Sequence, residues 1–251
     1  MRSLYRPWLL LGLTIAAVAA VFFLPPIAQA MSFHQFADHR PVWGVKNGAD
    51  VISNLFFLFV GITGLTLVAK ASGPRGLLLI YAVLFSGVVL TGVGSAWYHS
   101  NPNNDTLVWD RIPMTIVFMA LLSVTVAELI NRRLGIQLLM PLVFLGIGSV
   151  WLWHYTEEQG FGDLRIYYLV QFYPMLFIPL ILWLYYDPGR GYVLRPLVWV
   201  VFWYVIAKIF ERLDFPIYAA FGVSGHTLKH LAAGVSTWYF VVLFRERRSR
   251  W

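Results

Sequence analysis

Three histidines and one recurring spacing carry the chemistry of this sequence. His226 and His230 are four residues apart, and so are Ser95 and His99. Positions four apart on an α-helix lie on one face, one turn from each other, so each pair can reach a common point. Three imidazoles with an open fourth position form the ligand set of a catalytic zinc ion. The spacing therefore predicts a zinc site of His99, His226 and His230, if the fold joins the two segments.

Asp110 and Ser95 are the candidate catalytic side chains beside these histidines. His226 is followed by Thr227, where the helical zinc-protease motif has a glutamate, so a general base must come from elsewhere. Asp110 precedes an apolar segment and can serve as that base, or it can cap the helix that follows. Ser95 can hydrogen-bond a reacting oxygen, or it can merely permit close helix packing. For the histidine pair the alternative is a structural bridge between helices.

The composition indicates that these residues are held by membrane-embedded elements. Of 251 residues, 59% are hydrophobic and 12% are charged, and the mean hydropathy is +0.68. Soluble domains carry about 25% charged residues. Cysteine is absent, which excludes thiolate ligands, so a metal must be held by histidine and carboxylate. The formal charge of +7 lies mostly in connectors, which indicates topology signals and contact with anionic lipid rather than nucleic acid.

Eight apolar segments follow one another along the chain. Residues 1–30 have the layout of a signal peptide or signal anchor, with a basic start, an apolar middle and an Ala-Gln-Ala exit, and both cleavage and retention are open. Residues 31–251 hold seven segments near the ~20 residues that a bilayer requires. These are 51–69, 76–99, 112–130, 134–153, 166–186, 196–213 and 226–244. Because helices satisfy their own backbone in lipid, we expect an all-α seven-transmembrane-helix bundle preceded by an N-terminal helix.

The distribution of lysine and arginine orients these segments. If the N-terminus is cytoplasmic, twelve basic residues share that side: Arg2, Arg6, Lys70, Arg75, Arg132, Arg133, Arg190, Arg195, Arg245, Arg247, Arg248 and Arg250. The opposite side holds five: Arg40, Lys46, Arg111, Arg165 and Arg212. This bias agrees with the positive-inside rule. It predicts a cytoplasmic C-terminus, with His99, Asp110 and His226 on the periplasmic face of a bacterial inner membrane or the lumenal face of a eukaryotic one.

Three charged residues recur at three-residue spacing near the end of segment 196–213. They are Lys208, Glu211 and Asp214. Residues three apart on a helix can pair, so the first two predict a structural ion pair inside the bundle. Intramembrane charges also occur in proton and ion transporters, which is the alternative use. The segments, however, show no obvious duplicated halves of the kind that many transporters have.

A group of oxygen-bearing residues lies near the start of segment 51–69. Asp38, Asn47 and Asp50 offer the ligand type that calcium prefers. Capping and turn formation explain the same residues equally well, and the regular spacing of a calcium loop is missing. The sequence therefore leaves a calcium site open.

Several of these motifs occur together in one known family. The pattern consists of Ser53-Asn54-Leu55 with Val60-Gly61, Gly94-Ser95 with His99, Asp110 with Pro113-Met114, and finally His226 with His230. With it, the chain resembles the alkaline ceramidases over roughly residues 38–245. That family belongs to a superfamily of seven-helix membrane hydrolases that includes the adiponectin and progestin receptors. The resemblance implies a seven-helix bundle with a zinc site buried near one membrane face.

The resemblance also implies roles for individual residues. His99, His226 and His230 would bind zinc. Asp110 would shuttle protons, and Ser95 would steady the oxyanion, during hydrolysis of the ceramide amide to a sphingoid base and a fatty acid. Some members bind calcium through an acidic N-terminal region, in which this chain has Asn47 at an acidic position and Asp38 upstream.

We therefore expect a zinc-dependent intramembrane amidohydrolase acting on a ceramide-like N-acyl lipid. Its expected partners are the lipid substrate and the bilayer, without nucleic acid, and the sequence does not set an oligomeric state. One alternative is a hydrolase of another acyl lipid, and a second is a receptor or sensor that keeps the metal without turnover. A third is a haem protein that uses His99 and one of the later pair as axial ligands.

Overall fold

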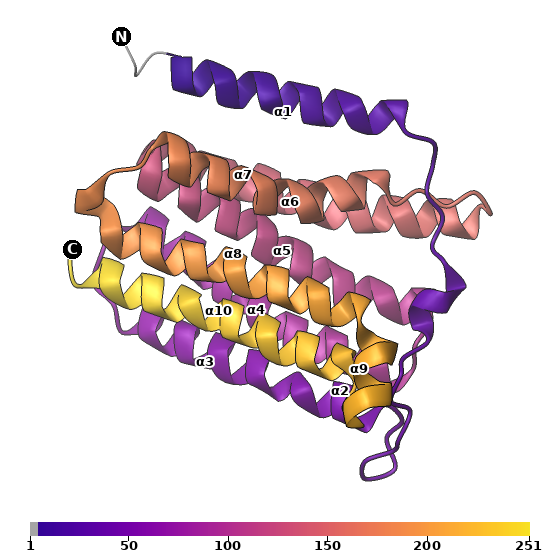
Figure 1. Ribbon diagram of the computed structural model, residues 1–251. Coiled ribbons are helices and arrows are strands. Elements are labelled where there is room, and N and C mark those ends of the chain that lie inside the picture. The colour runs from indigo at the N-terminus through magenta and orange to yellow at the C-terminus, as the bar shows by residue number, and fades with distance from the viewer. Residues whose placement is uncertain (1–4) are drawn as a thin grey trace.

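The computed structural model describes residues 5–251, and most of them are helical (Figure 1). The long helices are α1 (Tyr5–Phe23), α3 (Leu55–Ala69), α4 (Arg75–Ser100), α5 (Asn104–Leu129), α6 (Arg132–Glu158), α7 (Arg165–Leu184), α8 (Gly191–Arg212) and α10 (Gly225–Arg248). The short ones are η1 (Met31–His34), α2 (Gly48–Ser53), η2 (Pro188–Arg190) and α9 (Asp214–Phe221). Residues 5–251 contain no strand beyond one isolated bridge, so the expected all-α class is confirmed.

Seven helical segments of the part described are long and apolar enough to cross a membrane. They are Tyr5–Phe23, Gly48–Ala69, Arg75–Ser100, Asn104–Leu129, Arg132–Glu158, Arg165–Leu184 and Pro188–Arg212. The expected last span, α10, is not among them. It has 24 residues, but His226, Lys229 and His230 in its first two turns lower its hydropathy. The chain is thus compatible with a multi-pass membrane protein.

Helix α5 is the centre of the bundle. Its apolar window is 78% buried, the largest share of the seven, and it packs against α4, α6 and α7. Helix α10 lies between α8 and α3. Helix α1 lies apart, along α7, with Leu10 as its single buried residue and one hydrogen bond of 2.7 Å between the hydroxyls of Thr14 and Tyr173 (Figure 1).

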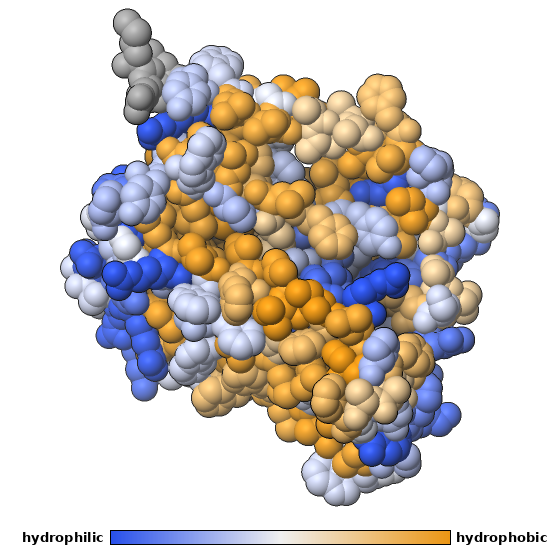
Figure 2. Space-filling view, in the orientation of Figure 1, coloured by the Kyte–Doolittle hydropathy of each residue, from blue (hydrophilic) through white to orange (hydrophobic). Residues whose placement is uncertain are grey.

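The outer surface is largely apolar. Figure 2 shows apolar side chains over most of this face, with hydrophilic side chains toward the ends of the helices and a further hydrophilic group within the right half of the face. Exposed rings such as Trp183 and Phe202 belong to this surface. In water such a continuous apolar patch would favour aggregation, whereas lipid tails cover it without cost.

Two glycines fix how the helices approach each other near the ends of α4 and α8. A Cβ on Gly94 of α4 would lie 2.0 Å from the Trp109 carbonyl oxygen of α5. A Cβ on Gly225 of α10 would lie 2.5 Å from the Phe210 carbonyl oxygen of α8. Small residues permit such close backbone contact between membrane helices. They bring the ends of α4 and α8 and the starts of α5 and α10 to one end of the bundle.

Candidate metal centre

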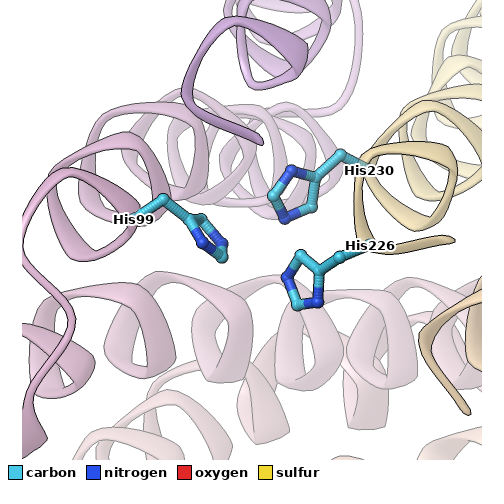
Figure 3. A group of neighbouring side chains, drawn as sticks. All are labelled: His99, His226 and His230. Atoms are coloured by element: carbon cyan, nitrogen blue, oxygen red, sulfur yellow. The ribbon is translucent and has the colours of Figure 1, made fainter. Parts of the chain in front are cut away.

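His99, His226 and His230 come together at this end of the bundle (Figure 3). His99 belongs to the last turn of α4, and the other two lie in the first two turns of α10 and face it from the opposite side. One ligand atom from each residue lies within 4.8 Å of the others. The ring centroids are 4.8 Å apart from His99 to either partner and 4.9 Å apart within the pair. The structure thus brings the three sequence-predicted ligands together.

The surroundings of these imidazoles fit a metal ion. Tetrahedral zinc, with bonds of about 2.0–2.1 Å, places ligand nitrogens roughly 3.4 Å apart, which small side-chain rotations can reach from this arrangement. His99 Nδ1 is buried and has no hydrogen-bond partner, so a metal would satisfy an otherwise orphaned nitrogen. All three rings are at most 6% exposed, which keeps bulk water from competing for the site. The triad can therefore bind a metal ion.

His230 is oriented by helix α2. Its Nδ1 lies 2.7 Å from the Ser53 hydroxyl and 3.1 Å from the Asp50 carbonyl oxygen. That carbonyl is available because the expected single helix over 51–69 breaks at Asn54, whose amide also donates to it at 2.8 Å. With Nδ1 engaged in this way, Nε2 is the nitrogen left for a metal, an arrangement typical of histidine ligands.

His226 is oriented by the cap of α10. The Ser224 hydroxyl accepts hydrogen bonds from the backbone N–H groups of His226 (3.0 Å) and Thr227 (3.2 Å), as an N-cap does. Asp214 Oδ1 accepts from the same hydroxyl at 2.7 Å and from the His226 N–H at 2.9 Å, while Oδ2 accepts from the Ala37 N–H at 3.0 Å. Asp214 is therefore an anchor for the helix that carries two of the candidate ligands.

Asp110 and Ser95 face each other across the α4–α5 contact. Both are buried, and the Ser95 side chain lies beside the Asp110 carboxyl group. The alternative that Asp110 caps its helix is wrong, because α5 begins at Asn104 and is capped by Asn103, whose side chain accepts from the Thr106 N–H at 2.9 Å. Asp110 lies in the second turn and is free for chemistry.

A cavity of about 270 Å³ extends from Asp110 into the bundle between α4, α5, α7, α8 and α10. Its charged lining residues lie at the histidine end: Asp110, Arg111, Lys208, Glu211 and Lys229. Farther along, the lining is apolar and includes Val117, Phe118, Leu121, Met175, Val200 and Phe240. Phe57 lines the cavity and also packs edge-on against the His230 ring at 6.3 Å, so cavity and triad adjoin.

The expected ion pair between Lys208 and Glu211 is present and has a third member. Lys208 contacts Glu211 on α8, and Lys229 Nζ of α10 lies 2.9 Å from the other Glu211 oxygen. Lys229 Nζ is also 3.3 Å from His226 Nε2. We did not single out Lys229 from the sequence. A lysine between two histidines of an apolar helix was the available signal.

The candidate calcium residues each have a separate partner. Asp38 is held by the Arg40 side chain at 2.6 and 2.8 Å, and these hydrogen bonds keep the pKa of its carboxyl below the ordinary value. The Asn47 amide donates to the His99 carbonyl oxygen at 2.8 Å, and Asp50 Oδ1 accepts from the Thr227 hydroxyl at 2.6 Å. Within residues 5–251, the histidine triad is the only metal-suited group of three or more His, Asp or Glu side chains. Calcium binding stays a prediction.

Comparison with known proteins does not assign this chain to a family. A scan against protein-family models and a search of curated proteins find no match to this chain. The chemistry of the centre is therefore inferred from its own groups, which are three imidazoles, one buried carboxyl group and one hydroxyl beside a cavity with an apolar interior.

Proposed function

We propose that this chain is a zinc-dependent intramembrane hydrolase that cleaves the amide bond of a ceramide-like N-acyl lipid. The observation that carries the proposal is the convergence of His99, His226 and His230 beside a cavity whose near end is charged and whose far end is apolar. Three imidazoles suit zinc, and a mixed cavity suits an amphiphile whose reactive bond lies between a polar group and a hydrocarbon chain.

Each residue of the candidate centre has its own role in the proposed hydrolysis. A zinc ion held by three imidazoles supplies an activated water and Lewis acidity at neutral pH. Asp110 accepts a proton from the attacking water and returns it to the leaving nitrogen as the C–N bond breaks. Ser95 lies beside the Asp110 carboxyl group, and stabilising the oxyanion is the role that the family resemblance implies.

The apolar part of the cavity holds the acyl chain. Each methylene group removed from water contributes roughly 0.8 kcal/mol, but a chain that leaves lipid gains much less, so the cavity selects mainly by shape. Its position inside an apolar bundle places it in the same phase as a membrane-dissolved substrate. This explains why such a reaction would use an apolar bundle at all.

The proposed orientation puts the centre on the non-cytoplasmic side. Arg245, Arg247 and Arg248 end α10 at the opposite end of the helix from His226 and His230, and basic residues favour the cytoplasm. In Figure 1 the C-terminus and the α2–α9 end lie at opposite ends of the bundle. The N-terminal helix α1, far less buried than the rest, fits a signal anchor or signal peptide.

Metal analysis combined with lipid hydrolysis tests the proposal. Purified full-length protein is expected to hold one zinc per chain and to release fatty acid from at least one member of an N-acyl and O-acyl lipid panel. His99→Ala is expected to lose both zinc and activity. Asp110→Asn is expected to keep zinc and lose activity by about 10²–10⁴-fold, the usual contribution of a general acid–base group.

The outcomes separate the alternatives. Release of fatty acid from esters but not amides would assign another acyl lipid as the substrate. Zinc without turnover of any panel member would favour the receptor or sensor. Absence of a stoichiometric metal from carefully isolated protein would overturn the proposal altogether.

A further inference from the structure

Arg111 is a buried charge that forms no salt bridge within residues 5–251. It follows Asp110 on α5, lines the cavity and is only 2% exposed. No carboxylate among residues 5–251 forms an ion pair with it. Its Nη2 donates to Gln29 Oε1 at 2.6 Å, and its Nη1 is buried with no hydrogen-bond partner. A buried charged donor left unpaired is costly, and such a group commonly serves a ligand.

Aromatic rings hold this guanidinium without satisfying its donors. Its central carbon lies 4.2 Å from the ring centroid of Trp153, 4.5 Å from that of Tyr167 and 5.4 Å from that of Phe33. Ring faces attract a cation, so the three rings fix the position of Arg111 and keep it charged. They offer no oxygen acceptor to Nη1. The guanidinium is therefore preorganised and lacks only an anion.

The charge of the cavity leads to the same conclusion. Its charged lining residues carry a formal charge of +1, because there are three basic residues and two acidic ones: Arg111, Lys208, Lys229, Asp110 and Glu211. Glu211 is shared by both lysines. The cavity is thus built to accept one further negative charge, at the end where the polar part of a lipid would lie.

We propose that Arg111 binds a negatively charged group on the amine half of the lipid substrate. The inference rests on the proposed function and narrows it, because the substrate is then an N-acyl lipid with a carboxylate, sulfonate or phosphate close to its amide, in place of the uncharged headgroup of ceramide. Arg111 and Asp110 line the same cavity, so a charge on the amine half of the substrate can reach the guanidinium while the acyl chain occupies the apolar end. A guanidinium fork matches such oxyanions in geometry.

Binding to metal-depleted protein tests this without turnover. Isothermal titration of the chelator-treated full chain in detergent compares N-dodecanoylglycine, which carries a carboxylate, with uncharged N-dodecanoylethanolamine. We expect a Kd at least tenfold lower for the carboxylate lipid. Dodecanoate is the third ligand. If it equals N-dodecanoylglycine in affinity, Arg111 binds the fatty-acid product and not the headgroup, and the assignment is overturned.

Two variants test whether the preference for the carboxylate lipid depends on Arg111. Arg111→Gln is expected to abolish the preference for the carboxylate lipid. In the chain that retains residues 1–30, Gln29→Glu keeps the arginine and places a carboxylate beside its Nη2. It is therefore expected to weaken binding of N-dodecanoylglycine at least tenfold and to change the Kd of the neutral lipid less than about twofold. This second variant serves even if Arg111→Gln fails to fold. Lys46→Gln removes an exposed basic residue and is expected to change neither Kd.

The results distinguish this inference from the proposed function. Equal Kd values in the wild type, or a preference that survives in both variants, would refute the role of Arg111 whether or not the zinc-loaded protein hydrolyses lipids. Conversely, a Kd ratio that depends on Arg111, together with no hydrolysis of either lipid, would retain the anion site and refute the hydrolase.

Discussion

The Ser53 hydroxyl lies 2.7 Å from Nδ1 of His230, so a residue of α2 orients an imidazole that α10 contributes to the candidate metal centre. The two residues are 177 positions apart in sequence. Partners of this kind fix the ring orientation of metal ligands, and their loss usually costs 10–100-fold in metal affinity.

Ser53→Ala is therefore expected to weaken zinc binding by about 10–100-fold while leaving the fold intact. Competition with a chromogenic chelator measures the affinity, and helical content by circular dichroism checks the fold. Ser249→Ala, at the exposed end of α10, is the matched control and should bind zinc like the wild type. Unchanged affinity in Ser53→Ala would show that His230 is not a ligand or is oriented by other means.

Asp214→Ala should lower thermal stability and zinc affinity together. The carboxylate accepts three hydrogen bonds, from Ser224, His226 and Ala37, and it is buried. Removing it leaves these donors unsatisfied, and each bond to a charged group is worth about 1.5–3 kcal/mol, although the losses are not additive. Thermal unfolding in detergent measures the change. Asp187→Ala, an exposed aspartate in a connector, is the control, and equal melting temperatures for both variants would contradict the anchoring role.

The lengths of the apolar segments predicted most of the helices. Helix boundaries were predicted less well where polar residues belong to a helix at the end of the bundle. The segment expected at 112–130 begins at Asn104, because Asp110 and Arg111 lie on a buried helical turn and not in a connector. Hydropathy cannot distinguish a charged residue facing a cavity from one facing water. The same limit applies to α10, whose first turns are polar since they carry the candidate ligands.

The ligand set followed from spacing, whereas its supporting contacts did not. The i, i+4 spacing put His226 and His230 on one helical face before any fold was known. The roles of Ser53, Asp214 and Arg111 depend on which helices become neighbours, and a single sequence does not show that. The break at Asn54 is similar, because the Asp50 carbonyl oxygen there is shared by the Asn54 side chain and by His230, which comes from a distant part of the chain.

The hydrogen bonds between Asp38 and Arg40 should make a contribution to folding stability that is lost in acid. Its hydrogen bonds from Arg40 lower the pKa of the carboxyl in the folded protein, so the bonds stabilise the fold above the unfolded-state pKa of about 4. This contribution disappears as the pH falls through the lower folded-state pKa. Asp38→Asn is expected to melt below the wild type at pH 7, with the difference closing toward pH 2–3. A difference that persists there would indicate that the Arg40 ion pair is not its source.

Gly94 gives the sharpest test of how α4 and α5 bring Ser95 to Asp110. A Cβ at this position would lie 2.0 Å from the Trp109 carbonyl oxygen, which is backbone and cannot move aside as a flexible side chain would. Gly94→Ala should therefore separate the two helices, destabilise the protein by about 1–3 kcal/mol and reduce hydrolysis. Gly148→Ala on α6 is the matched control, because nothing lies within 4 Å of its Cβ. That substitution should be neutral or stabilising by up to about 1 kcal/mol, since alanine favours helix over glycine. If thermal unfolding finds the two variants equally stable, the close α4–α5 contact and the Ser95–Asp110 arrangement that depends on it are wrong.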